Sequence, residues 1–157
     1  SLDEPVEQAA LQILNVVFAV PQLSVRLAEL PPEHLAMVRH YTAWWRANRD
    51  VLLDGAFEPH APLANYPLVI ARSERKLIAA AYAFMAVPVE GTPEAVDVLN
   101  ASGGERLVLD APRPLGAYRY RVLDALGAVR DEGDVRLDGP RGFDVPLGGM
   151  VALERRR

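Results

Sequence analysis

The sequence predicts a mainly β protein: an antiparallel β-sandwich of about eight strands preceded by two α-helices. From Tyr66 onward, short apolar segments are separated by turn residues at intervals of roughly eight to twelve residues, a spacing typical of sandwiches and barrels. Residues 118–122 alternate apolar and Arg side chains, which places one side of a strand inward. This half shows no strand-helix-strand alternation, so we do not expect a parallel sheet.

The first 57 residues carry the helical pattern. Residues 3–19 are expected to form a helix, with Pro5 in its first turn and an end before Pro21. A second helix is expected over 34–53, a run without Gly or Pro that follows two prolines and precedes Gly55. The organisation we expect is therefore a helical segment over 1–57, a linker over 58–65 and the sandwich over 66–157.

The sandwich strands are expected between clusters of Gly, Pro, Asp and Ser. The predicted strands are 68–71, 76–87, 95–99, 106–109, 118–123, 135–137, 143–145 and 150–154. The predicted turns are 91–93, 102–104, 112–116, 131–133, 138–142 and 148–149.

Composition limits the class of protein. Half of the 157 residues are apolar, enough for one compact unit with a real core. A net charge of −4 argues against nucleic acid as a partner, because phosphate binding needs clustered Lys and Arg. The longest apolar stretch, 13–21, is too short to cross a bilayer, so no membrane span is expected. The chain has no cysteine and its first residues lack a basic signal region, which favours the cytoplasm.

The sequence contains no recognisable catalytic, cofactor or metal motif. No serine lies in a Gly-x-Ser-x-Gly turn. His34 and His40 are six residues apart on a helix and point in different directions, and His60 stands alone in a predicted loop. The acids at 131, 132 and 134 lack the spacing of a calcium loop. We therefore expect no catalytic residue, no cofactor and no metal ligand within this chain.

The helix over 34–53 has an apolar arc wider than a surface helix needs. Its two stripes contain Leu35, Val38, Trp45 and Leu52, and Met37, Tyr41, Trp44 and Val51. Such a helix should lie between two layers, of which the sandwich can supply one. We therefore expect an interdomain or dimer interface at Trp44, Trp45, Tyr41, Met37 and Arg49, whereas the terminal Arg155, Arg156 and Arg157 are expected to fray into solvent.

Four segments together carry a family resemblance. They are the helical stretch 41–55, the strand segment Tyr82-Ala83-Phe84, the strand end Val98-Leu99-Asn100-Ala101-Ser102, and Val145-Pro146-Leu147-Gly148-Gly149-Met150-Val151. In this order they resemble the end of the α-galactosidase (melibiase) group of clan D glycoside hydrolases, which includes family 36-like enzymes. The resemblance spans nearly the whole chain.

The resemblance implies that catalysis belongs to another part of the protein. In that group the catalytic nucleophile and the acid/base are aspartates on strands of a β/α barrel that would precede Ser1, so no residue here inherits those roles. The two helices would then be the last helices of that barrel, and the sandwich would be a non-catalytic accessory domain that packs on it. The upstream barrel is the expected partner, and a homodimer through the exposed helix is the alternative cover for the apolar arc.

Two other functions stay open at this point. An independent carbohydrate-binding module would need exposed aromatic side chains on one sheet face, and Tyr118 and Tyr120 are the same-face pair in a predicted strand. A free enzyme with a cryptic site would need a constellation that the sequence does not display.

Overall fold

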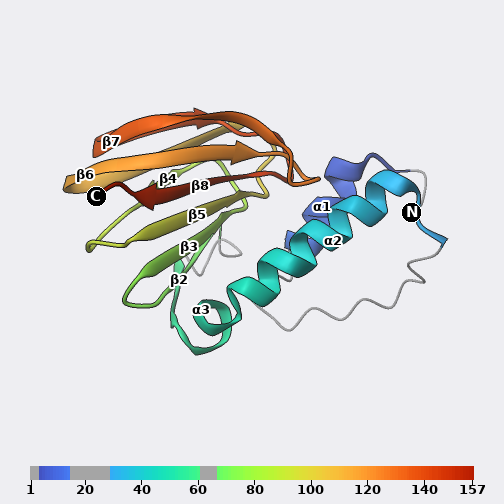
Figure 1. The fold of residues 1–157 in the computed structure, drawn as a ribbon, viewed down its shortest axis with the longest axis horizontal. Helices are drawn as coiled ribbons and strands as arrows, with labels where there is room; N and C mark the ends of the chain where they lie inside the picture. Colours follow the sequence, from blue (N-terminus) through green and yellow to red (C-terminus); the bar gives the residue numbers. More distant parts are fainter. Residues whose placement is uncertain (1–3, 15–28, 61–66) are drawn as a thin grey trace.

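A computed structural model describes residues 4–14, 29–60 and 67–157, with the backbone alone described over 56–60. In this described part, three helices precede the sheet: α1 (Val6–Leu14), α2 (Pro32–Ala47) and α3 (Arg49–Asp54). Helix α1 confirms the core of the helix expected over 3–19, whose residues 3 and 15–19 lie outside the described part. In Figure 1, α1 and α2 lie side by side on one side of the sheet.

The single helix expected over 34–53 is wrong, because the chain breaks at Asn48 into α2 and α3. The side-chain amide of Asn48 donates a hydrogen bond to the Trp44 carbonyl at 2.9 Å, and its backbone N–H contacts the same carbonyl at 3.1 Å. An Asn that bonds the preceding turn in this way competes with the helical hydrogen-bond pattern. The break turns α3 toward strands β2 and β3.

Strands make up most of the remaining chain and form one hydrogen-bonded sheet. They are β1 (Ala56–His60), β2 (Leu68–Arg72), β3 (Lys76–Ala81), β4 (Ala86–Pro88), β5 (Ala95–Asn100), β6 (Arg106–Leu123), β7 (Val129–Asp144) and β8 (Met150–Arg155). The sheet order is β1-β2-β3-β5-β8-β6-β4, with β7 paired to β6. The described residues thus form a mixed fold, in which three helices are followed by a mostly antiparallel sheet.

The expected antiparallel sandwich is correct only in its coarser part, the predominance of strands and of antiparallel pairing. Strand β3 pairs with β5 in parallel, and so does β4 with β6. Residues 82–94 explain the parallel pairing of β3 and β5. After β3 they cross to the far edge of the sheet, form β4 beside β6, and return to β5; a crossover of about a dozen residues permits parallel pairing. The segment Tyr82-Ala83-Phe84, expected within a strand over 76–87, lies in this crossover.

The long hairpin of β6 and β7 replaces four shorter strands of the prediction. Ala111 pairs with Gly139 and Gly116 pairs with Leu137, so residues 112–115 face the single residue Asp138. This bulge bends the hairpin, and in Figure 1 its outer part arches over the rest of the sheet. The turns expected at 112–116, 131–133 and 138–142 are therefore wrong: these residues lie inside strands, and the hairpin turns at 124–128.

The predicted linker over 58–65 begins inside a strand. Residues 58–60 belong to β1 and pair with 68–70 of β2 at one edge of the sheet. Pro59 is compatible with this position because an edge strand can leave one side without backbone donors. Residues 61–65 lie outside the described part.

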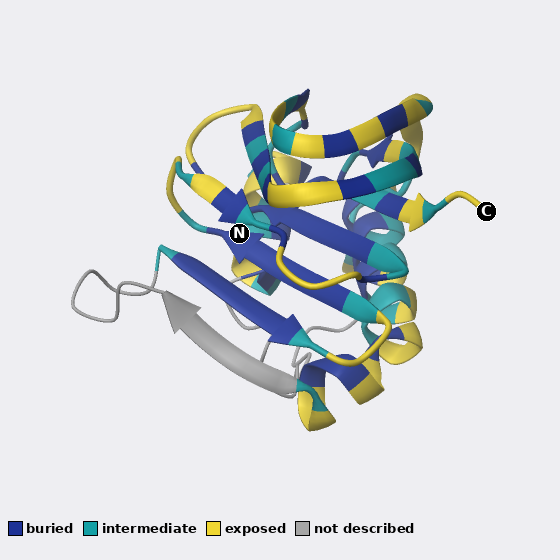
Figure 2. Ribbon diagram, turned by 90° about the vertical axis from the view of Figure 1, so that its left-hand side faces the viewer, coloured by how far each residue is buried: buried dark blue, intermediate teal, exposed yellow. Residues whose placement is uncertain are grey.

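The sheet is buried on both faces. One face packs inside the curve of the sheet, where Ile70, Leu77, Val98, Tyr118 and Leu153 belong to one core. The other face packs under the helices, and α1 and α2 join strand residues in a second core. Figure 2 shows the consequence: β2, β3 and β5 are almost entirely buried, whereas the outer hairpin alternates buried and exposed residues.

Candidate functional site

The helices are fastened to the sheet at a junction built from the four segments that carry the family resemblance. The Tyr41 hydroxyl of α2 donates a hydrogen bond to the Gly148 carbonyl, and the Gly148 N–H donates to the Asn100 carbonyl at 2.9 Å. The Tyr82 hydroxyl donates to the Leu14 carbonyl at the end of α1, at 2.7 Å. We call Tyr41, Tyr82, Asn100 and Gly148 the junction residues.

Asn100 organises two loops at the end of β5. Its side chain is fully buried and donates to the Gly104 and Val145 carbonyls at 2.9 and 2.8 Å. Its side-chain oxygen accepts hydrogen bonds from the N–H and the hydroxyl of Ser102, at 3.1 and 2.7 Å. The Asn-Ala-Ser sequence is therefore a structural device that joins the 101–105 loop to the segment before β8.

The two glycines before β8 permit close approach of the helices and the sheet. Gly148 has a φ of +74°, and a side chain there would come within 2.8 Å of the Ala10 methyl group on α1. A side chain at Gly149 would lie 2.3 Å from the Leu123 carbonyl. Larger residues would push α1 or β6 away from this corner.

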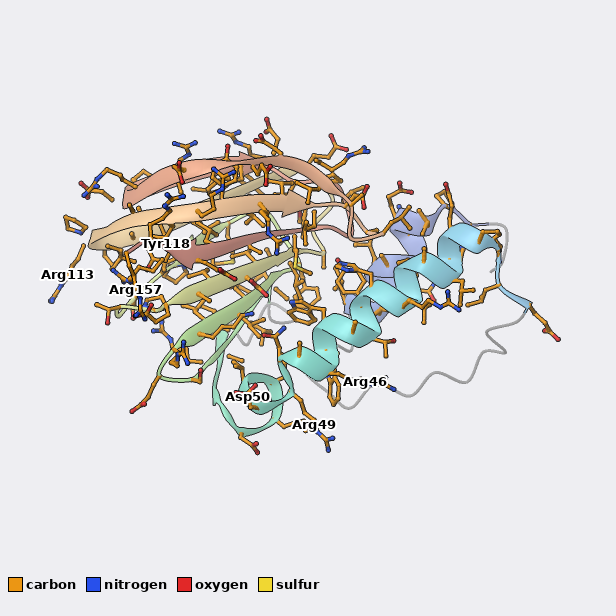
Figure 3. All side chains as sticks on the ribbon, viewed as in Figure 1. Arg46, Arg49, Asp50, Arg113, Tyr118 and Arg157 are labelled. Carbon is orange, nitrogen blue, oxygen red and sulfur yellow. The ribbon has the colours of Figure 1, made fainter. Side chains whose placement is uncertain are left out.

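The interface residues expected on the second helix pack within this chain. Met37 and Tyr41 are buried, and Trp44 and Trp45 are half-buried against the same core. The Arg49 guanidinium lies 5.9 Å from the centre of the Trp45 ring. The sheet thus covers most of the apolar arc, while Figure 3 shows Arg46 and Arg49 pointing away from the sheet.

Burial also sets the chemistry of the junction tyrosines. It raises the pKa of Tyr41 well above its ordinary value and the pKa of Tyr82 to about 12. Both hydroxyls therefore remain protonated, and remain hydrogen-bond donors, throughout the physiological pH range.

A second arrangement lies on the same sheet face, where the C-terminal end of α2 leaves part of the sheet open. A cleft of about 400 Å³ lies there between α2 and strands β3, β5, β8 and β6. Its walls are formed by Trp44, Asn48, Lys76, Ala95, Asp97, Arg119, Arg121, Leu123, Met150, Ala152 and Glu154. We call this space the α2 cleft.

Asp97 is the central group of the α2 cleft. It is only 5% exposed, although it is an acid in the middle of the sheet. One of its carboxylate oxygens, Oδ2, accepts a hydrogen bond from the Trp44 indole N–H at 2.8 Å and lies 2.9 Å from the Lys76 ammonium nitrogen. A buried carboxylate requires partners of this kind, so the three side chains form one unit that ties α2 to β3 and β5.

The open side of the α2 cleft carries further charges. Arg119 lies 3.7 Å from both Glu132 and Asp134, a loose surface contact. Arg121 and Glu154 have no ion pair with any residue that the structure describes. The cleft therefore offers positively charged hydrogen-bond donors and negatively charged acceptors beside the indole ring of Trp44.

Tyr118 and Tyr120 do not form an exposed platform. Tyr118 is fully buried and its hydroxyl donates to the Pro93 carbonyl at 2.6 Å, while Tyr120 packs edge-on against the Phe143 ring at 5.2 Å. The prediction that they could offer an exposed aromatic face is wrong, because their side of β6 faces inside the curved sheet.

The expected fraying of the three terminal arginines is wrong for Arg155, which belongs to β8, whereas Arg156 and Arg157 lie beyond β8 and are exposed. The Arg155 guanidinium donates to the Tyr118 hydroxyl and to the Leu115 carbonyl, at 2.9 and 2.8 Å. Arg156 pairs with Asp134 at 3.0 Å, and Arg157 lies 3.5 Å from Glu94. Figure 3 shows Tyr118 and Arg157 at the same end of the sheet.

Within the described ranges 4–14, 29–60 and 67–157, no group of His, Asp and Glu side chains converges as a metal site requires. His34 is buried on α2, and His40 packs against the turn between β6 and β7, where Gly127 leaves room for its ring. Burial lowers the pKa of His40, while the nearby Asp124 acts in the opposite direction. No helix in the described residues is long and apolar enough to span a membrane.

Comparison with known proteins found no match for this chain among protein-family models, curated proteins or solved structures.

Of the two arrangements, the junction uses residues that the sequence had singled out, whereas the α2 cleft was missed. One signal could have found it. Charged residues recur on one face of otherwise apolar strands, as in the run Val96-Asp97-Val98, and strand pairing places 76, 97, 119, 121 and 154 on the same side of the sheet.

Proposed function

We propose that this chain is the non-catalytic C-terminal accessory part of a glycoside hydrolase resembling the α-galactosidases, and that it packs on and stabilises an upstream catalytic barrel. The observation that carries the proposal is the junction. Tyr41, Tyr82, Asn100 and Gly148 come from the four separate segments of the resemblance, and they contact one another or join the same helices to the sheet. In a non-catalytic accessory domain, the residues that resemble the family should hold the domain together, and here they hold the helices to the sheet.

The junction gives this role a physical basis. The hydroxyl contacts and the close-packed glycines hold α1 and α2 against the sheet, so the helices and the sheet behave as one body. The opposite face of α2 carries exposed Arg39, Ala43, Arg46 and Ala47 at helical spacing. The two alanines leave room for another helical layer and the two arginines can form ion pairs with it, so this is the face that we assign to the barrel.

The alternative, an independent carbohydrate-binding module, loses the tyrosine pair on which it depended. Tyr118 is fully buried, so a sugar could not stack on it. Any sugar contact by this chain must therefore use another surface.

The experiment begins with the reading frame upstream of Ser1. The proposal expects it to encode a β/α barrel with two aspartates at strand ends, and expects the longer protein to hydrolyse a nitrophenyl α-galactoside while the present chain does not. A matched pair of variants in the longer protein, Arg46→Glu on the outer face of α2 and Arg141→Glu on β7, tests the assigned face. Arg46→Glu should lower the thermal midpoint of the barrel, and Arg141→Glu should not.

Two results would refute the proposal. One is an upstream sequence without a barrel, and the other is turnover of the nitrophenyl substrate by the present chain alone. Equal destabilisation by both Arg variants would refute the assignment of the outer α2 face.

A further inference from the structure

We draw no further inference here: the strongest candidate, the α2 cleft between the C-terminal end of α2 and strands β3, β5, β8 and β6, holds charged groups of both signs beside one indole ring, and nothing among the described residues shows which class of ligand would fill it.

Discussion

Removal of one hydroxyl group at the junction should measurably weaken the whole fold. In Tyr41→Phe the ring, which is 2% exposed and packs edge-on against Trp44, keeps its place. Only the hydrogen bond to the Gly148 carbonyl is lost. The substitution therefore isolates one contact between α2 and the segment before β8.

The magnitude follows from burial. The Tyr41 side chain and Gly148 are both buried. In the Phe variant the Gly148 carbonyl therefore loses its hydroxyl donor, and the phenyl ring that fills the space offers no polar atom in its place. Leaving such a group unsatisfied costs about 1–3 kcal/mol. For a chain of this length, each kcal/mol corresponds to a shift of about 2–4 °C in the thermal midpoint, so the expected decrease is roughly 2–12 °C.

The assay is thermal denaturation of the chain, followed by circular dichroism and by Trp fluorescence, with Tyr120→Phe as the matched control. The Tyr120 hydroxyl bonds Asp131 at 3.2 Å in an exposed position, so its loss should cost less than about 0.5 kcal/mol. If Tyr41→Phe is no more destabilising than Tyr120→Phe, the hydroxyl contact does not hold the helices to the sheet, and the account of the junction fails.

Three other predictions concern the cleft, the glycine corner and pH. Lys76→Met should lower the free energy of unfolding by about 3 kcal/mol in urea titrations, because Asp97 would be buried with only the indole donor; a change under about 1 kcal/mol would show that the pair is not needed. Gly148→Ala should cost at least about 1 kcal/mol, because its φ is +74° and α1 leaves no room for a methyl group, and a wild-type urea midpoint would contradict this. Burial lowers the pKa of His40 in the folded state, against the opposing effect of Asp124, so the unfolded chain binds the proton first and stability should fall as pH drops below about 6.5. The urea midpoint should therefore be lower at about pH 5.5 than at about pH 7.5, and His40→Gln should reduce that difference; an unchanged difference would assign it to other groups.

The strand content of this fold could be predicted because local alternation reports which side of a strand is buried. Strands β2, β5 and β8 lie within a residue or two of the expected ranges. The strand boundaries of the β6–β7 hairpin could not be predicted. Glycines, prolines and charged residues, such as those at 112–116 and 131–133, occur in bulges and solvated outer strands as well as in turns. The decisive factor was pairing between distant residues, which a local pattern does not contain.

The second predicted helix also shows what a local sequence pattern cannot predict. Its wide apolar arc predicted an interdomain or dimer interface at Met37, Tyr41 and the two tryptophans. In the structure these side chains pack against the sheet of the same chain, because a local pattern does not identify the layer that covers it. The break at Asn48 was missed because it depends on a side-chain hydrogen bond rather than on Gly or Pro. The α2 cleft was missed because Lys76, Asp97 and Arg121 lie on three strands that only the sheet order brings together.

Strand β8 lies between β5 and β6, although it is the last strand in the described chain. Without it, the sheet separates into β1-β2-β3-β5 on one side and β6 with β4 and β7 on the other. Until β8 has paired, β5 and β6 therefore each present an unpaired edge, and such edges are where strands of different molecules can pair during folding. Chaperone demand and soluble yield in cells should accordingly depend on residues 150–155 more than on any surface loop.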